Sequence, residues 1–567
     1  MERVVNRLQQ IAQMLYRPIN YDEKIFVNIP TLVASALLGT VIVSACAPTQ
    51  SIEPQGITND PTILTGAERC AALINTKNSR VALEITEATY VKNVDGIPPQ
   101  QHKLRQLQRE SFKPYCKISG YFEQRKGVNN APYAIGFGLS LPDDWNGKFL
   151  FQGGGGLNGF IREPLGALAA GDTPAVFRGY AVATTDSGHQ SKNRFDTTFF
   201  EDQLSLLNFY SGAIEKSTAL ALQIVEDVYQ APPDNKYFVG CSTGGREALT
   251  MAQRQPELFN GVIVGAPARQ TNYSEVADLW SAKRLHQASS IPNSTPFSKA
   301  QQHAIVTEVL AQCDYKDGLI DGLIFNVEAC DFKPEKLICS NNSDAKACID
   351  ASSATALNEA FAGPKYDSGR QIYPGFYFDT GISASGEKSV PGLLQAKAGP
   401  LGRQYAKEDF NLEKQLALAE NFPLAGGNAL LTNLSSFAHK GHKVMFFHGV
   451  SDPWFSAKDT LQYYQQMRKD SGNSELASQW SQFYFVPGMG HCRGGEKALD
   501  NFDMLTQLEH WVEHNQAPEF ILATGDSMPD ISRPLCPYPQ IPIYDGLGDT
   551  SKATSFVCKV SKPASAK

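Results

Sequence analysis

The chain has 567 residues, of which 42% are hydrophobic and 19% charged, a composition typical of a globular protein with a large core. Chains of this length usually exceed one folded unit, so we expect a catalytic domain with a substantial insertion. The net charge of −7 and the pI near 5.9 argue against a nucleic-acid surface. No nucleic-acid partner is therefore expected.

The first part of the chain predicts export. Basic residues precede an uncharged stretch from Ile25 to Ser51, which contains small residues followed by Cys46. This pattern is typical of a bacterial lipobox, in which cleavage precedes a cysteine that becomes lipid-modified. The alternative is an uncleaved membrane anchor, since the uncharged stretch is nearly long enough to span a bilayer. Because the leading segment is longer than usual, Met14 is a candidate for the true start. We expect residues 1–46 to be a signal and lipobox segment. The protein is then a periplasmic or outer-membrane lipoprotein, or secreted.

The 11 cysteines agree with an oxidising compartment. With Cys46 assigned to the lipid, an even number remains, as expected of a disulfide framework. Pairing cannot be read from sequence alone. Proximity favours Cys313–Cys330, Cys339–Cys348 and Cys536–Cys558, which leaves Cys70–Cys116 and the long-range Cys241–Cys492.

The order of predicted elements is that of an α/β protein. Buried strands are expected over 148–152 and 180–184, a long amphipathic helix over about 202–229, and further strands over 237–239 and 261–265. The alternation stops near Arg269 and returns with strands over 443–448 and 483–487. This alternation of short apolar strands and helices predicts a parallel sheet wrapped by helices, in an α/β-hydrolase fold. We expect residues 60–268 and 429–567 to form the catalytic domain, and residues 269–428 an inserted lid.

A G-x-S-x-G sequence, Gly240-Cys241-Ser242-Thr243-Gly244, lies between a predicted strand and helix, as in a nucleophile elbow. Two later strands end in loops that carry Asp452 and His491. The order Ser, Asp, His is that of an α/β-hydrolase triad, at the strand ends where parallel sheets place their sites. We predict Ser242 as nucleophile, His491 as general base and Asp452 as its orienting acid. The alternative is that the Asp and the His are turn residues in glycine-rich loops.

Two backbone amides are needed for an oxyanion hole. Thr243, which follows the nucleophile, is predicted to supply one. The glycine run Gly153–Gly156 follows the strand over 148–152 and is predicted to supply the other, from Gly154 or Gly155. A phosphate-binding loop is the alternative, but no Lys-Ser/Thr follows the run.

The pattern Cys241-Ser242, Asp452 and His491-Cys492 resembles the tannase and feruloyl esterase family of α/β-hydrolases. The resemblance extends over nearly the whole chain after residue 46, including Gly153–Gly156 and the segment Thr185-Asp186-Ser187-Gly188-His189. It implies a disulfide between the neighbours of the serine and the histidine. The chain looks most similar to the bacterial branch that contains mono(2-hydroxyethyl) terephthalate hydrolase, whose five-disulfide layout matches the pairing above.

Three carboxylates lie in the predicted lid between residues 313 and 323, interspersed with glycines. Such a loop suits Ca²⁺, although a solvated acidic loop explains the composition equally well. The family resemblance implies a structural Ca²⁺ bound through the carboxylates of Asp314, Asp317 and Asp321 and the carbonyls of Leu319 and Leu323.

The substrate is predicted only as a class. Aromatic residues that could flank a planar acyl group are Trp280, Tyr373, Phe376, Tyr377, Phe378, Trp454 and Phe455, and buried aromatics are more often core. Phe455 is the chosen substrate-binding residue. No lid arginine (Arg269, Arg284, Arg370 or Arg403) could be assigned to a substrate carboxylate. We predict a serine esterase for small aromatic esters, of the feruloyl, tannate or terephthalate half-ester type. The alternatives are an acyltransferase with the same triad and a non-catalytic surface lipoprotein. The sequence leaves the oligomeric state open.

Overall fold

The computed structural model describes residues 66–78, 81–97, 112–288, 296–340, 344, 346–385, 390–397, 399, 401, 410–472 and 476–560. They belong to one compact unit, Thr62–Lys567. The predicted signal segment, with Met14 and Cys46, lies outside the described residues, as does Arg403. In the part of the chain that is described, no helix is long and apolar enough to cross a membrane.

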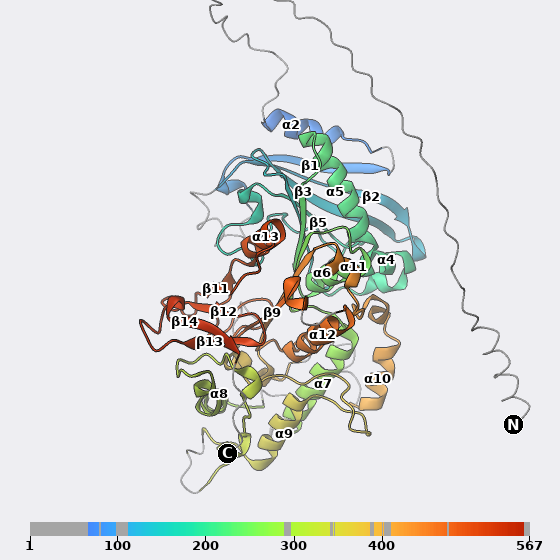
Figure 1. Ribbon diagram of the computed structural model, residues 1–567. Coiled ribbons are helices and arrows are strands. Elements are labelled where there is room, and N and C mark those ends of the chain that lie inside the picture. Colours follow the sequence, from blue (N-terminus) through green and yellow to red (C-terminus); the bar gives the residue numbers. More distant parts are fainter. Residues whose placement is uncertain are drawn as a thin grey trace, which may run out of the picture. The chain divides into compact units, whose positions relative to one another are not determined.

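A nine-stranded sheet organises the unit, in the order β1-β2-β3-β5-β4-β6-β7-β8-β9 (Figure 1). Its antiparallel end was not predicted and consists of β1 (Leu83–Val91), β2 (Tyr115–Lys126) and β3 (Pro132–Pro142). The remaining strands run parallel to one another. They are β4 (Lys148–Gln152), β5 (Ala181–Thr185), β6 (Asn235–Cys241), β7 (Gly261–Gly265), β8 (Lys443–Gly449) and β9 (Ser481–Val486).

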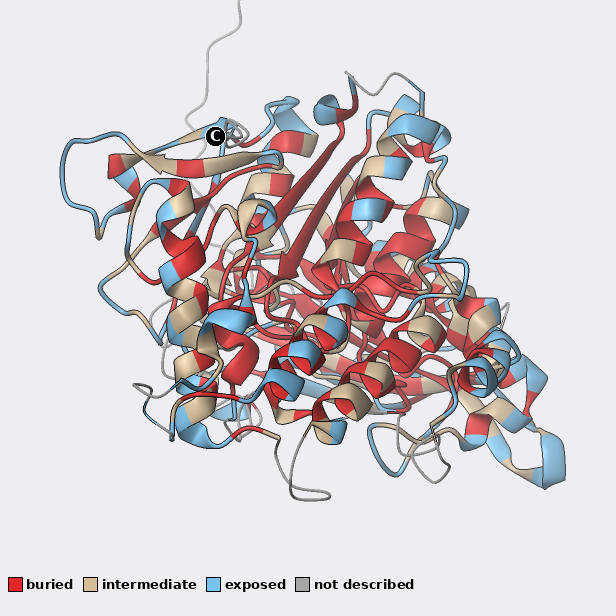
Figure 2. Cartoon of the chain, turned by 90° about the horizontal axis from the view of Figure 1, so that it is seen from below, coloured by how far each residue is buried: buried red, intermediate tan, exposed pale blue. Residues whose placement is uncertain are grey.

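Helices cover both faces of this sheet, so that its central strands are buried (Figure 2). One face packs against α5 (Ala213–Tyr229), α6 (Thr243–Arg254), α11 (Ser435–His439) and α12 (Ala457–Asp470). The other face packs against α13 (Met504–His514). A parallel sheet with helices on both faces confirms the predicted α/β-hydrolase type of fold.

The predicted long helix over 202–229 is interrupted in the structure. A short α4 (Gln203–Leu207) leads into a π-helical turn, Asn208–Gly212, before α5 begins. The side chain of Asp202 caps α4 by accepting a hydrogen bond from the Ser205 N–H at 2.8 Å.

The long connection between β7 and β8 contains the predicted lid residues and is helical. Its helices are α7 (Thr271–Gln287), α8 (Lys299–Cys313), α9 (Ala351–Ala362) and α10 (Leu412–Glu420). The first three share an apolar core of their own. Since β7 and β8 pair directly, this connection leaves and re-enters the sheet between neighbouring strands.

Smaller elements complete the unit. A short N-terminal helix, α2 (Gly66–Ala72), precedes β1. After β9 the chain forms a three-stranded sheet of β10 (Asn501–Phe502), β11 (Ile521–Thr524) and β12 (Arg533–Leu535), and a hairpin of β13 (Gln540–Tyr544) and β14 (Phe556–Val560).

All five predicted disulfides are confirmed. The bonds join Cys70 to Cys116, Cys241 to Cys492, Cys313 to Cys330, Cys339 to Cys348, and Cys536 to Cys558. Four of them close loops of 9 to 46 residues, whereas Cys241–Cys492 spans 251.

Candidate active site

Ser242 occupies a tight turn between β6 and α6. Its backbone angles, φ 66° and ψ −126°, are unusual for a residue with a side chain. The turn is held on both sides, because the Ser242 N–H donates to the Gly265 carbonyl at 3.1 Å and the Ser242 carbonyl accepts from Arg246 and Ala268. This is the strained strand-to-helix geometry of a nucleophile elbow.

Asp452 and His491 lie together at the ends of β8 and β9. His491 Nδ1 is 2.7 Å from Asp452 Oδ2, a hydrogen bond that fixes the ring orientation. Asp452 Oδ1 accepts hydrogen bonds from the backbone N–H groups of Trp454 and Phe455 at 2.9 and 3.1 Å. Burial opposes ionisation of the Asp452 carboxyl, but the contacts with His491 and His448 hold its pKa below the usual range. The acid is therefore an anion when it orients the imidazole.

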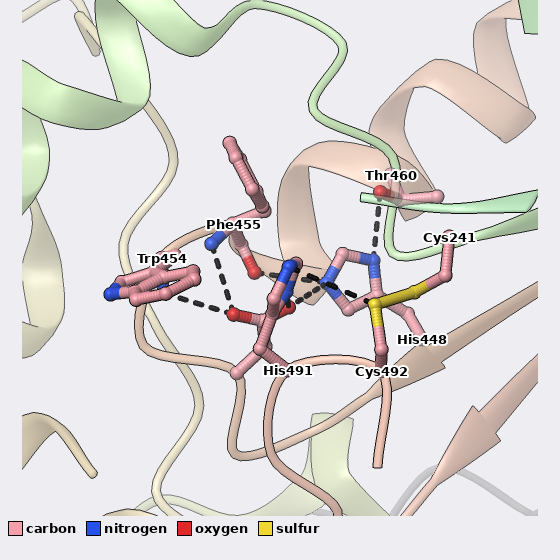
Figure 3. The surroundings of a disulfide bond; sticks show 8 residues. Cys241, His448, Trp454, Phe455, Thr460, His491 and Cys492 are labelled. Atoms are coloured by element: carbon pink, nitrogen blue, oxygen red, sulfur yellow. Dashed lines mark hydrogen bonds and ion pairs between the residues drawn. A yellow bond between two sulfur atoms is a disulfide. The ribbon is translucent and has the colours of Figure 1, made fainter. Parts of the chain in front are cut away.

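The disulfide Cys241–Cys492 joins this pair to the elbow. Its two Cα atoms are 6.0 Å apart, and each cysteine is a direct neighbour of a predicted catalytic residue. His491 Nε2, the ring nitrogen that is not bonded to Asp452, lies 3.7 Å from Cys492 Sγ. It therefore lies beside the disulfide that connects His491's neighbour to the elbow (Figure 3). Within the described residues, Ser242 Oγ has no hydrogen bond to His491. In unliganded enzymes this bond is often long and tightens only in the substrate complex.

The glycine run packs against the elbow, although not as predicted. A Cβ on Gly244 would come within 2.7 Å of the Gly154 carbonyl oxygen, so the two segments approach more closely than side chains allow. The Gly154 N–H donates to Glu247 Oε2 at 2.8 Å, and the Gly155 N–H donates to Asn158 Oδ1 at 2.7 Å. Because both N–H groups are engaged, the structure does not support the predicted assignment of Gly154 or Gly155 to the oxyanion hole.

Two other N–H groups remain beside the elbow. Thr243 Oγ1 donates to the Gly156 carbonyl, which brings Gly156 next to the residue that follows Ser242. Across the described ranges, neither the Thr243 N–H nor the Gly156 N–H has a hydrogen-bond partner. These two amides are available to an incoming oxygen.

Glu247, which the sequence reasoning missed, organises the glycine run. Its side chain is fully buried and accepts hydrogen bonds from Asn158 Nδ2 at 2.6 Å and Ser187 Oγ at 3.1 Å, besides the one from Gly154. The sequence offered one signal for this role: Glu247 lies on the inward face of the predicted helix after the elbow. A buried carboxylate needs hydrogen-bond donors around it, so polar partners could have been expected there.

The aromatic residues have several roles. The Phe455 and Trp454 rings lie 5.3 and 5.1 Å from the His491 ring, centroid to centroid, so both border the predicted base (Figure 3). Phe455 is only 5% exposed. The lid aromatics include structural residues: Phe378 stacks on Phe361, and the Tyr373 hydroxyl accepts a hydrogen bond from the Ser456 N–H.

The acidic loop predicted to bind calcium is partly buried. The carboxylates of Asp314 and Asp317 accept hydrogen bonds from backbone N–H groups of residues 319–325. Burial raises the pKa of both groups, that of Asp317 to about 7, and the neighbouring Asp321 adds to the rise. Asp321 itself pairs with Arg533.

The fit of this loop to a metal ion is incomplete as it stands. No group of three or more His, Cys, Asp or Glu side chains within the described residues lies close enough together to hold an ion. The carbonyl oxygens of Leu319 and Leu323 accept no hydrogen bond from any described residue. The two buried carboxylates and free carbonyls are hard oxygen ligands, but Asp321 would have to leave Arg533 to join them.

Comparison with known proteins identifies the family. The model for tannase and feruloyl esterase matches residues 116–409 and 413–559. The chain belongs to this family and is a carboxylic ester hydrolase. A mono(2-hydroxyethyl) terephthalate hydrolase of Piscinibacter sakaiensis is 31% identical, over 78% of this chain and 84% of its own length. Feruloyl esterase B of Aspergillus niger is 27% identical, over 74% and 82%.

Solved structures agree with the fold. Feruloyl esterase B from Aspergillus oryzae superposes with a TM-score of 0.69 at 23% identity, over 87% of this chain and all of its own (100%). Tannin acyl hydrolase from Aspergillus niger gives a TM-score of 0.66 at 19% identity, over 87% and 95%.

Proposed function

We propose that the protein is a serine esterase that cleaves small aromatic carboxylic esters through an acyl-enzyme on Ser242. The observation that carries the proposal is the 2.7 Å bond between His491 Nδ1 and Asp452 Oδ2, tethered to the elbow by Cys241–Cys492. With Nδ1 bonded to the acid, the Nε2 atom is left to serve as the base toward Ser242.

The steps follow from this arrangement. His491 Nε2 takes the Ser242 proton as Oγ attacks the ester carbonyl carbon. The N–H groups of Thr243 and Gly156 stabilise the negative oxygen of the tetrahedral intermediate. The intermediate collapses, and the alcohol leaves with the proton from His491. A water then gives a proton to His491 and attacks the acyl carbon. When this second intermediate collapses, the bond to Ser242 Oγ breaks, His491 returns the proton to Oγ, and the carboxylic acid is released.

The substrate class rests on the relatives and on the rings beside His491. The relatives named above act on feruloyl and terephthalate esters according to their names. Trp454 and Phe455 provide flat apolar surface next to the base. Methyl ferulate, methyl gallate and mono(2-hydroxyethyl) terephthalate would rank the candidate acyl groups.

The experiment that tests the proposal compares the wild type with Ser242→Ala on a chromogenic aryl ester. The wild type should release free acid and show an acyl adduct on the peptide that contains Ser242 after rapid quenching, whereas the variant should show neither. Equal hydrolysis by both proteins would refute the assignment. Ester product in place of acid, when an alcohol is added, would indicate an acyltransferase.

Two accessory features are proposed with this function. The first is export, with lipidation of Cys46 or secretion; the five disulfides support an oxidising compartment. The second is a structural Ca²⁺ held by Asp314, Asp317, Asp321, Leu319 and Leu323, which would neutralise the buried acids of the lid loop. Its support is the burial of Asp314 and Asp317 beside the Leu319 and Leu323 carbonyls, which accept no hydrogen bond from the described residues.

A further inference from the structure

Arginine side chains gather beside the glycine run. A Cβ on Gly155 would overlap Arg162 Nη2, so the missing side chain leaves the space that the guanidinium occupies. A Cβ on Gly156 would likewise come within 2.7 Å of Arg194 Cγ. The Gly156 carbonyl accepts a hydrogen bond from the Thr243 hydroxyl, so both arginines lie close to the nucleophile elbow.

The Arg162 guanidinium has no acidic partner in contact among the described residues. Arg162 is half-buried, yet it forms no hydrogen bond or ion pair with any residue that the structure describes. Burial lowers the pKa of Arg162, and the nearby Arg194 and Arg493 lower it further, while Glu247 attracts it at longer range. The Glu247 oxygens already accept three hydrogen bonds. An anion placed among these guanidinium groups would relieve their repulsion.

The same arginines lie near the predicted base. Arg493 follows Cys492 directly and is exposed, as is Arg194. Phe195, the neighbour of Arg194, packs edge-on against Trp454 with centroids 6.2 Å apart, and Trp454 in turn packs against His491. The charged cluster therefore lies near the predicted base.

Two lid arginines are already engaged. Arg269 forms an ion pair with Asp459, and Arg284 lies 3.3 Å from a carboxylate oxygen of Glu359. Neither guanidinium is free to take a substrate anion without losing its partner. Arg162 has no such partner among the residues that the structure describes.

We propose that Arg162, with Arg194 and Arg493 at the rim, binds a carboxylate of the ester substrate beside the nucleophile elbow. The proposal rests on the esterase function proposed above. A guanidinium suits this task because its planar fork donates two parallel hydrogen bonds to a carboxylate. The carboxylate can belong to the acyl group, as in a half-ester of an aromatic diacid, or to the leaving alcohol, as in an ester of a hydroxy acid.

The test compares carboxylate-bearing and neutral esters in two arms. The acyl arm uses monomethyl terephthalate against methyl 4-methylbenzoate, and the alcohol arm uses the benzoyl ester of glycolic acid against ethyl benzoate. For each pair, the ratio of kcat/KM values, charged over neutral, is measured for the wild type and for Arg162→Gln. We expect the ratio to fall in one arm by about tenfold or more, mainly through KM, the scale of a charge-assisted hydrogen bond. The arm that responds identifies the source of the carboxylate.

Three further variants complete the design. Arg162→Lys keeps the positive charge but lacks the planar guanidinium. Its kcat/KM ratio, charged over neutral ester, should therefore lie between those of the wild type and Arg162→Gln. Arg194→Gln changes an exposed residue and should lower the ratio less, so it provides a readout if the Arg162 variants do not fold. Lys192→Gln removes an exposed charge from the same loop and is the control. Unchanged ratios in both arms, or an equal change in the Lys192 variant, would overturn the proposal. A wild type that hydrolyses no ester would instead refute the esterase function itself.

Discussion

His448 Nε2 lies 3.4 Å from Asp452 Oδ2, so the acid of the predicted triad faces two histidines (Figure 3). The same nitrogen is 2.9 Å from the Phe455 carbonyl, while Nδ1 is 2.9 Å from Thr460 Oγ1. The Phe455 carbonyl can only accept, so Nε2 carries the proton. This N–H also points positive charge toward Asp452, and His448 is fully buried. We interpret His448 as a positioning residue for the acid.

Replacement of His448 by Gln should lower kcat/KM about tenfold, since leaving a buried polar group without its partner costs about 1–3 kcal/mol. The acid limb of the pH profile of kcat/KM should also move to higher pH. The contact with His448 helps to hold the pKa of Asp452 low, so its loss should raise that pKa and leave Asp452 neutral up to a higher pH. His442→Gln, at a buried histidine hydrogen-bonded to the Pro256 carbonyl, is the control for a structural loss. A reduced rate with an unmoved acid limb would argue against a positioning role.

Removal of the Cys241–Cys492 bond by a double Ser substitution should lower both stability and turnover. The bond closes a loop of 251 residues and holds the His491 loop at the elbow, and a typical disulfide contributes about 2–4 kcal/mol. Denaturant unfolding and ester hydrolysis would measure the two effects. The Cys339–Cys348 pair, with a separation of 9, is the matched control and should lose less stability and keep its turnover. Equal turnover losses in both double variants would contradict a specific role of the bond.

The lid loop should show pH-dependent stability in chelator. Burial raises the pKa of Asp317 from 3.8 to about 7, so the folded state holds this proton more tightly than the unfolded state. Stability contributed by the protonated group is therefore lost as pH rises from about 4 through about 7. Asp317→Asn should weaken this dependence, as followed by melting temperature. Asp331→Asn, at an exposed lid position, is the control.

If the same loop binds calcium, added Ca²⁺ should raise the wild-type melting temperature more at pH 8 than at pH 5, because the ligands must be ionised. The Asp317→Asn variant should respond less. A wild type whose melting is unaffected by Ca²⁺ and by chelator at both pH values, with no metal by elemental analysis, would exclude the site.

Asp278→Asn should stabilise the protein at alkaline pH. Asp278 and Glu275 are both buried on α7, and the two Asp278 oxygens have no hydrogen-bond partner in the described part of the chain. Burial raises the pKa of Glu275 to about 8, and burial with repulsion from Glu275 and Asp452 raises that of Asp278. Ionisation of the pair therefore costs stability as pH rises, and the variant should gain melting temperature at pH 9 but little at pH 5. Glu413→Gln, exposed on α10, is the control; a gain that is equal at both pH values would contradict this reasoning.

Much of the fold was predictable because its central strands are short, apolar and buried on both faces. The bounds predicted for β4 and β7 agree with the structure. Among the missed antiparallel strands, β1 and β2 mix buried and exposed residues, and bulges disturb their alternation.

The site was predictable in its residue types and less so in its hydrogen bonds. The motif around Ser242 and the strand-end positions of Asp452 and His491 follow from local sequence. The occupation of the Gly154 N–H does not, since its partner Glu247 lies 93 positions away. The pairing of Asp452 with His448 depends on how the loop after β8 folds back on its own strand, which local pattern does not encode.

Cys241 and Cys492 bracket almost half of the polypeptide, including every helix between α6 and α12. A protease that cuts the chain once between these two positions would leave one fragment with Cys241 and another with Cys492. The fragments would stay joined, and Asp452 and His491 would remain covalently attached to the Ser242 side for any cut within the lid. A nicked molecule should migrate as intact protein on a non-reducing gel and separate only after reduction. The bond thus keeps the two sides of the predicted active site covalently joined after a cut in the long connection between β7 and β8.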